Sequence, residues 1–425
     1  MAKAIELLQW SKVMTAGSRN LEAGQVQEAR NAFAEAVTLA RRMVHLELLA
    51  FSLRMLGLAN NRLGLPSEAR QNLAEALELY RTANNRRGEA EALAGLAGAA
   101  YALEQIELAE SLFEESCCLF EQIDEQLRKV MVLCDLGTLH GSVCNWDKAL
   151  QAYDTALQLC RKLEEKHGQA EILVMLGELS RRQGNLEECA VHLLAASLLF
   201  ASLGEQKSLA STLQYLGLTY HDMNETERGM DCHRRALSIW LDLGERQEAG
   251  LVLFALGKMA QSMGNFATAE EFLLQSLEFV HNDPESAGYR QQNLGGLYLV
   301  LHDLGKAEEY FIAALASFRQ AGKQARAGEV LETLGFIREI AGDWQEAEKY
   351  YLQALDNLPE SGGEKRRAEL LRTLGLLYAD QGQDKKAVRW LWSALDMFRS
   401  LDASEASRLE QDIQHLSHRI RRGGN

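Results

Sequence analysis

Proline is scarce in this chain: its 425 residues include only Pro66, Pro284 and Pro359. Since proline interrupts helices, this scarcity permits long uninterrupted ones. Basic residues are outnumbered, and 45 Lys and Arg against 60 Asp and Glu give a formal charge of −15. Nucleic acids select basic surfaces, so this balance argues against them as ligands. We expect no nucleic-acid partner and a preference for protein partners of mixed or basic charge.

Signals for export and membrane insertion are also lacking. The start, MAKAIELLQWSKVM, has no apolar core followed by a small-residue cleavage site, and no uninterrupted apolar run approaches membrane-spanning length. The seven cysteines form no CxxC pair, and an odd number cannot close completely into internal disulfides. We therefore expect a cytoplasmic protein that does not bind membranes.

What the sequence does contain is a small residue that recurs every forty positions. We call these residues the repeat glycines, and one of them is an alanine. They are Gly17, Gly57, Ala97, Gly137, Gly177, Gly217, Gly257, Gly295, Gly335 and Gly375, and only the step from Gly257 to Gly295 is shorter, at thirty-eight. A fixed period of this length is typical of a repeat protein, in which each unit packs only on its neighbours.

Each unit is predicted to be a helical hairpin. Apolar residues recur at intervals of three and four on both sides of a central Gly-Asn or Gly-Asp pair, such as Gly184-Asn185 or Gly342-Asp343. Glycine there can end the first helix in a left-handed conformation, and Asn or Asp can cap the second. So short a turn makes the two helices antiparallel.

The repeat glycines are expected to mark close contact between the two helices. A mid-helix glycine costs about 1 kcal/mol relative to alanine, so a packing reason is required. After Gly335, for example, a small residue follows at Ala347, a large one at Tyr351 and another small one at Ala354. We expect the small residue twelve positions later, on the second helix, to pack against the glycine of the first helix.

Leu-Gly followed by this small–large–small pattern resembles the tetratricopeptide repeat, here lengthened from the usual ~34 residues to forty. Longer units of this kind are found in Pins-type adaptors, kinesin light chains and bacterial regulators of the MalT and Rap kinds. The resemblance implies an all-α, right-handed α-solenoid over residues 1–402. Its ten hairpins are expected at 10–49, 50–89, 90–129, 130–169, 170–209, 210–249, 250–287, 288–327, 328–367 and 368–402. The apolar spacing of residues 403–420 predicts a C-terminal capping helix that covers Trp390 or Trp392, and 421–425 are predicted to be a frayed tail.

The resemblance also implies a binding site. In this family the first helix of each hairpin lines a concave groove that binds an extended or helical segment of another protein. Carrying the groove-facing positions onto this chain gives Arg54, Asn61, Arg62, Glu171, Glu178, Arg181, Arg182, Gln214, His221, Phe254, Lys258, Glu332, Phe336, Glu339 and Arg372. The arginines are favoured among them, because a guanidinium grips carboxylates and is enriched at interface hot spots.

No motif for catalysis, a cofactor or a metal is recognisable. The cysteines clustered between Cys117 and Cys160 lack the paired spacing of a zinc site, and we interpret them as packing residues. We therefore expect a non-enzymatic scaffold or adaptor that needs no cofactor.

Two alternatives remain open. One is a ligand- or peptide-responsive regulator whose superhelix closes on binding, although fewer than ten residues precede the first repeat and we expect no DNA-binding module there. The other is homo-oligomerisation through the terminal repeats.

Overall fold

A computed structural model describes residues 2–280, 282–358 and 363–422, and over these ranges the chain is helical with no strand. The helices are α1 (Ala2–Glu22), α2 (Val26–Met43), α3 (Leu46–Arg62), α4 (Pro66–Thr82), α5 (Arg86–Ala102), α6 (Ile106–Gln122), α7 (Gln126–Ser142), α8 (Trp146–Lys162), α9 (Lys166–Arg182), α10 (Leu186–Leu203), α11 (Gln206–Asp222), α12 (Thr226–Asp242), α13 (Arg246–Ser262), α14 (Phe266–Glu278), α15 (Pro284–Val300), α16 (Leu304–Gln320), α17 (Gln324–Ile340), α18 (Trp344–Asp356), α19 (Glu364–Asp380), α20 (Asp384–Leu401) and α21 (Ala403–Arg422). Pro359 lies outside the described residues.

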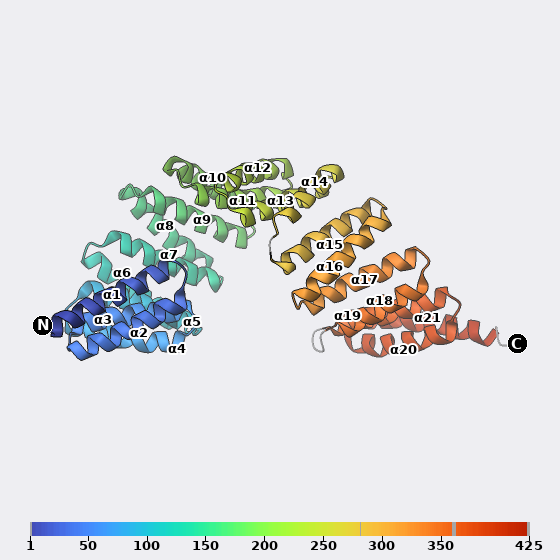
Figure 1. Ribbon diagram of the computed structural model, residues 1–425, viewed down its shortest axis with the longest axis horizontal. Coiled ribbons are helices and arrows are strands. Elements are labelled where there is room, and N and C mark those ends of the chain that lie inside the picture. Colours follow the sequence, from blue (N-terminus) through green and yellow to red (C-terminus); the bar gives the residue numbers. More distant parts are fainter. Residues whose placement is uncertain (1, 281, 359–362, 423–425) are drawn as a thin grey trace. The chain divides into compact units, whose positions relative to one another are not determined.

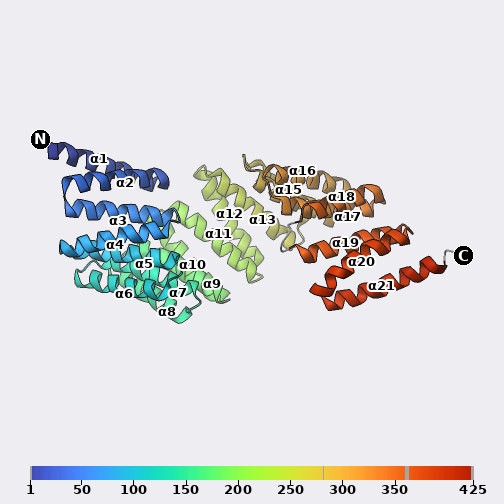
Figure 2. The ribbon, with the colours of Figure 1, turned by 90° about the horizontal axis from the view of Figure 1, so that it is seen from below.

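Within each of two units the helices form antiparallel pairs, as predicted, and each pair packs on the next. The chain divides into two compact units, Met1–Glu225 and Thr226–Asn425. Within the first unit α1 to α4 lie in successive layers, which Figure 2 shows side by side and Figure 1 shows from another direction. The second unit repeats this arrangement from α12 to α21. The predicted all-α solenoid is confirmed.

The helix boundaries follow a simple rule. Helices α3, α4 and α5 each contain 17 residues, separated by the turns 63–65 and 83–85. Two such helices and two such turns account for the forty-residue unit, so the extra length relative to the usual repeat lies in the helices. The first helix of each hairpin from α3 to α19 begins four residues before the repeat boundary expected from the sequence, for example at Leu46 rather than at residue 50.

Most turns repeat every twenty residues, half the period of the sequence. These turns contain one residue with a positive φ: Gly24, Val44, Gly64, Asn84, Glu104, Asp124, Cys144, Glu164, Gly184, Gly204, Asn224, Gly244, Gly264, Asn282, His302, Gly322, Gly342 and Gly382. Except for Asn282, which lies beyond the end of α14, each ends its helix in the left-handed region, as predicted for Gly184 and Gly342. The turn between α20 and α21 differs, because Asp402 there is extended. The capping prediction is only partly correct: the side chain of Asp343 accepts from the backbone N–H of Glu346, whereas that of Asn185 makes no capping bond.

The repeat glycines contact the large side chain sixteen positions later. A Cβ atom on Gly57 would lie 2.5 Å from Cγ of Leu73, and one on Gly335 would lie 2.7 Å from Cε1 of Tyr351. The same pairing joins Gly17 to Phe33, Gly137 to Tyr153, Gly177 to Leu193, Gly257 to Leu273, Gly295 to Phe311 and Gly375 to Leu391. The predicted close contact between the two helices is therefore confirmed. The nearest atoms to each glycine belong to the large residue sixteen positions later, not to the small residue twelve positions later.

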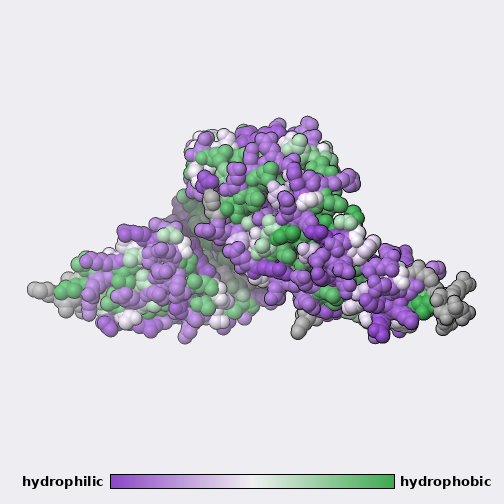
Figure 3. Space-filling model, turned by 45° about the vertical axis from the view of Figure 1, so that its right-hand side comes forward, coloured by the Kyte–Doolittle hydropathy of each residue, from purple (hydrophilic) through white to green (hydrophobic). Residues whose placement is uncertain are grey.

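The surface is mainly hydrophilic, with apolar side chains gathered in separate patches on the face that Figure 3 shows. One helix among the described residues, α10, is long and apolar enough to span a membrane by length and composition, although Glu187, Glu188 and His192 interrupt its apolar residues, so the expectation of no uninterrupted apolar run of that length stands. It packs against α9 and α11. Val191, Leu194 and Leu198 on α10 are nevertheless exposed.

The last helix, α21, packs on the last hairpin. Leu409, Ile413 and Leu416 are buried in one cluster with Leu395 and Phe398 of α20. Trp390 packs against this cluster, whereas Trp392 remains 49% exposed. The end of the array therefore partly buries one of the two tryptophans that α21 was expected to cover. The helix also extends to Arg422, two residues into the predicted frayed tail, and 423–425 lie outside the described residues.

Candidate functional site

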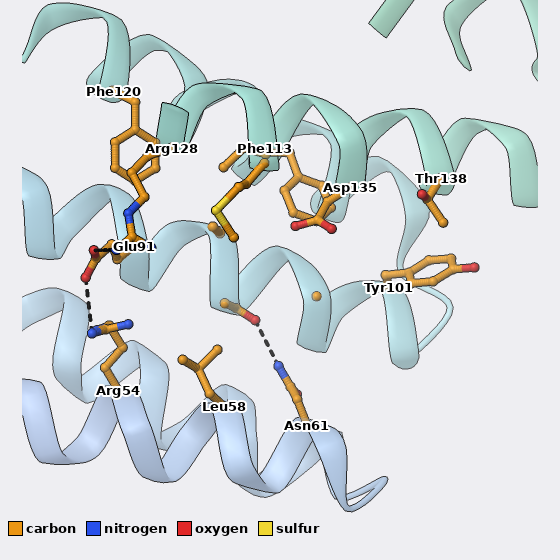
Figure 4. A pocket seen from close by; sticks show the side chains of 15 residues that line it. Arg54, Leu58, Asn61, Glu91, Tyr101, Phe113, Phe120, Arg128, Asp135 and Thr138 are labelled. Carbon is orange, nitrogen blue, oxygen red and sulfur yellow. Dashed lines mark hydrogen bonds and ion pairs between the residues drawn. The ribbon is translucent and has the colours of Figure 1, made fainter. Parts of the chain in front are cut away.

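A well-formed hollow of the first unit lies across α3, α5 and α7, the first helices of three successive hairpins (Figure 4). Its volume is 360 Å³. The floor comes from α5, where Ala94, Gly95 and Gly98 have too little side chain to fill the space. Helix α3 contacts α5 directly, and residues of α7 complete the lining. The hollow therefore follows from small residues on the middle helix of three neighbours.

One end of the hollow is rich in guanidinium groups. Arg54 of α3 pairs with Glu91 of α5 at 3.2 Å, Arg87 approaches the same carboxylate at 3.5 Å and Arg128 of α7 at 3.9 Å. Arg87 also pairs with Glu125 at 3.3 Å. Three guanidinium groups are thus paired with only two carboxylates, Glu91 and Glu125. The excess positive charge favours binding of an anionic group of a ligand.

The other end carries Asp135 of α7, a carboxylate that forms no ion pair with any described residue. It points into the hollow toward α5 in Figure 4, and Met131 and Thr138 of the same helix also line the hollow. Its side chain is accessible from the hollow, but the surrounding protein displaces much of its water, and this desolvation raises the pKa of Asp135 to about 6. A cationic group bound beside it would stabilise the charged form.

Replacing Asp135 with asparagine is expected to raise the melting temperature at about pH 7.5. Above pH 6 the folded protein holds this carboxylate charged at a desolvation cost that the unfolded chain does not bear. As the pH falls through the folded pKa of about 6 toward the ordinary value of 3.8, the side chain takes up a proton and the advantage of asparagine disappears. Thermal melts of both proteins across this pH range measure the effect, with the exposed Asp154→Asn as control. An advantage that persists unchanged at about pH 4 would contradict this explanation.

Two polar atoms in the wall of the hollow have no hydrogen-bond partner among the described residues. Asn61 donates through Nδ2 to the backbone oxygen of Gly95 at 3.1 Å, and its buried Oδ1 accepts nothing. The buried Nε of Arg54 donates to nothing. Buried polar groups in native proteins are nearly always paired, so both atoms call for an explanation.

A smaller hollow continues the wall between α7 and α9. Its volume is 210 Å³, and Thr138 lines both hollows. Glu178 and Arg182, two of the predicted groove residues, lie here, and Arg182 donates to the backbone oxygen of Gly141 at 3.3 Å. The first helices from α3 to α9 thus carry an uninterrupted series of lining residues.

Other predicted residues of the first unit lie on the expected helices but are engaged with neighbouring side chains. Arg181 pairs with Asp222 at 3.0 Å and lies over the ring of Tyr215. Glu171 pairs with His167 at 3.3 Å, and Arg62 is exposed outside the larger hollow. The remaining two, Gln214 and His221, are half-buried on α11, and neither is without a partner.

The structure does not gather the predicted residues of the second unit into one site. Phe254 lies beneath the guanidinium of Arg290, and Lys258 is exposed. Three lie on α17: Glu332 pairs with Arg366, Glu339 accepts from the hydroxyl of Tyr351, and Phe336 is 50% exposed. The last, Arg372, pairs with Glu405 of α21 at 2.7 Å.

Several residues of the larger hollow were missed by the sequence reasoning. Groove positions were carried onto repeats two, five, six, seven, nine and ten but not onto three and four. The same offsets from Ala97 and Gly137 give Glu91, Gly98, Tyr101, Met131 and Thr138, all of which line the hollow. The signal was therefore present in the sequence.

Comparison with known proteins identifies the repeat. The tetratricopeptide repeat family matches residues 128–198, 287–360 and 326–400, and these segments are built of the helical hairpins described above. The chain contains tetratricopeptide repeats. Among solved structures, the apo form of RapI has a TM-score of 0.56 at 12% identity, covering 82% of this chain and 97% of RapI.

Two further similarities connect these tetratricopeptide repeats with larger proteins. A STAND signal-transduction ATPase with a tetratricopeptide repeat sensor, PH0952 from Pyrococcus horikoshii, has a TM-score of 0.55 at 15% identity, covering 85% of this chain and 55% of that one. The regulatory protein AfsR of Streptomyces griseus is 26% identical over 226 residues. That match covers 52% of this chain, which spans about a fifth (22%) of the length of AfsR.

Proposed function

We propose that this tetratricopeptide repeat protein is a non-enzymatic scaffold that binds a peptide segment of another protein along the first helices of its hairpins. The observation that carries the proposal is the hollow across α3, α5 and α7, with guanidinium groups at one end and the unpaired carboxylate of Asp135 at the other. Its length across three helices suits an extended segment better than a compact metabolite.

The charges of the hollow favour a segment of mixed charge. An acidic side chain or a C-terminal carboxylate would contact Arg54 and Arg128, and a lysine or arginine would contact Asp135. The apolar part between them, with Leu58 and Met131, would accept an aliphatic side chain. A peptide backbone could also satisfy Asn61 after a rotation of its amide, because it supplies the N–H that Oδ1 lacks.

We extend the proposal to the absence of catalysis and to a cytoplasmic location. All seven cysteines are free thiols, and five of them are buried. Burial raises the pKa of Cys117 and of Cys134 to about 12, which disfavours the nucleophilic thiolate. These thiols therefore support the interpretation of the cysteines as packing residues.

A regulator that responds to a bound peptide or small molecule is the second candidate. It is favoured by the likeness to AfsR, a regulatory protein, and to PH0952, whose repeats are a sensor. Here binding in the hollow would change the closure of the superhelix. Small-angle scattering with and without the bound peptide separates the candidates: a changed radius of gyration supports the regulator, and an unchanged one supports the rigid scaffold.

Replacing Gly98 with leucine is expected to abolish peptide binding without destabilising the repeats. A Cβ atom on Gly98 would have only Nδ2 of Asn61 within 4 Å, at 3.7 Å, so a larger side chain enters the hollow and not the helix contact. Leu58 and Leu218 occupy the equivalent position of other repeats, and removal of a mid-helix glycine favours the helix by about 1 kcal/mol.

The control is Gly296→Leu, the same change at the same repeat position on α15, where nothing lies within 4 Å of the added Cβ. Affinity capture with mass spectrometry on the wild type identifies the partner, and fluorescence anisotropy with its peptide measures binding. Binding lost with Gly98→Leu and kept with Gly296→Leu supports the hollow as the site. Equal binding by both variants would place the site elsewhere.

A further inference from the structure

A buried arginine replaces a core residue at one position of the second unit. In repeats two to seven, nine and ten the side chain five residues before the repeat glycine is buried, whereas Lys12 of the first repeat is exposed. The buried residues are Ser52, Ala92, Val132, Ile172, Thr212, Val252, Val330 and Leu370, all uncharged and at most 4% exposed. The eighth repeat has Arg290 there, only 5% exposed. A charged group in an otherwise uncharged core position is costly unless something pairs with it.

The replacement coincides with the single break in the forty-residue period. Helix α14 has 13 residues where the equivalent α12 has 17, and α15 begins at Pro284. The shortening leaves Phe279 and Val280 beyond the end of α14, where both line a cavity of 240 Å³ together with Arg290. The irregular spacing and the buried charge therefore belong to one local feature.

The guanidinium of Arg290 is incompletely satisfied. Its Nη1 donates to the backbone oxygen of Ser286 at 3.1 Å, whereas its buried Nε has no partner. The ring of Phe254 lies 5.7 Å away, and the absence of a side chain on Gly250 leaves room for Nη2. No carboxylate of the described residues lies within ion-pair distance of Arg290, and Asp283 interacts with its charge only at longer range, so the compensation is partial.

A second arginine lies at the same cavity. Arg246, at the start of α13, is exposed and lies over the ring of Phe279 at 5.0 Å. Gln247 and Ser286 add polar groups to the lining. The one carboxylate there, Asp283, caps α15 by accepting from the backbone N–H of Ser286 at 3.1 Å. The cavity thus holds two guanidinium groups and one carboxylate, and that carboxylate already accepts a hydrogen bond, so the net charge of the cavity is positive.

We propose that this cavity between α13, α14 and α15 binds a small oxyanion, the carboxylate or phosphate group of a ligand, between Arg246 and Arg290. The planar guanidinium matches both anions, and pairing would offset the cost of burying Arg290. The ligand can enter because Arg246 is exposed while Arg290 lies inside. The site does not depend on the peptide hollow, which belongs to the first unit.

Thermal melts of the full chain with sodium phosphate or sodium acetate, against sodium chloride at equal ionic strength, test the proposal. An excess of the bound anion is expected to raise the melting temperature by about 3 °C, because it binds only the folded state. A rise with acetate alone identifies a carboxylate site, and a rise with phosphate alone a phosphate site. No rise with either anion overturns the proposal.

Arg290→Leu restores the residue type of Leu370 and is the decisive variant. It is expected to remain folded, to melt no lower than the wild type in chloride and to lose the anion-dependent rise. Arg235→Leu, which removes an exposed charge from the same unit, is expected to keep the rise. A rise that survives in Arg290→Leu shows that the anion binds elsewhere and overturns the assignment.

Discussion

Replacing Gly257 with alanine is expected to lower the free energy of unfolding of its hairpin by about 2 kcal/mol, although alanine is the better helix former. The added Cβ would lie 2.7 Å from Cγ of Leu273 and 3.3 Å from its backbone nitrogen. Leu273 is completely buried, and neither it nor its backbone can withdraw without opening the hairpin. Hydrogen exchange over α13 and α14 measures the loss where it occurs, since a repeat array need not unfold in two states.

Gly296→Ala is the matched control, because this mid-helix glycine has nothing within 4 Å of an added Cβ. It is expected to stabilise α15 by about 0.5–1 kcal/mol, the ordinary advantage of alanine over glycine. The two substitutions are chemically identical and opposite in predicted sign. A stabilising Gly257→Ala would show that the helix contact is not what requires glycine.

The double variant Gly257→Ala/Leu273→Ala isolates the contact. Leu273→Ala alone is expected to cost about 2–5 kcal/mol through the cavity that it leaves. In that background the Cβ added at position 257 no longer meets a leucine, so Gly257→Ala is expected to cost nothing or to stabilise. A coupling energy near zero would mean that the two residues act independently.

The sequence predicts the packing of this fold better than its turns. The repeat glycines are visible because eight of the ten positions are shown to meet a buried side chain, and burial restricts which residues are tolerated. The left-handed turn residues are exposed, so Glu104, Asp124 and Glu164 can occupy them as well as glycine. The twenty-residue period of the backbone is therefore hidden in the sequence, whereas the forty-residue period of the packing is plain.

The sequence predicts which positions line the site, but it does not predict the ion pairs that the side chains form there. Offsets from the repeat glycines place Arg54 and Asn61 on the wall of the hollow, and they would have placed Glu91 there as well. They do not reveal that Arg54 pairs with Glu91 across two repeats or that Asp135 has no ion pair, because these outcomes depend on side-chain reach between helices. Arg372 shows the same limit, since its partner Glu405 lies beyond the last repeat.

Replacing Leu409 with aspartate is expected to detach α21 from the last hairpin, with a local loss of about 3 kcal/mol or more. Leu409 is 1% exposed among Leu395 and Phe398, and an unpaired carboxylate in that cluster would have no partner. Hydrogen exchange is expected to lose protection throughout α21. Gln414→Asp, which adds the same charge at an exposed position of the same helix, is expected to leave the protection unchanged.

The same variant distinguishes a cap from an autoinhibitory helix. If α21 only covers the apolar end of the array, its release exposes Leu395 and Phe398, so α19 and α20 lose protection and self-association increases. If α21 also blocks a binding surface, its release frees Arg372 from Glu405 and the affinity for a partner peptide rises. We expect the first result, because the buried contacts of α21 are with the core of the last hairpin, and its ion pair with Arg372 is partly exposed. A gain in affinity that Arg372→Gln abolishes would establish the second.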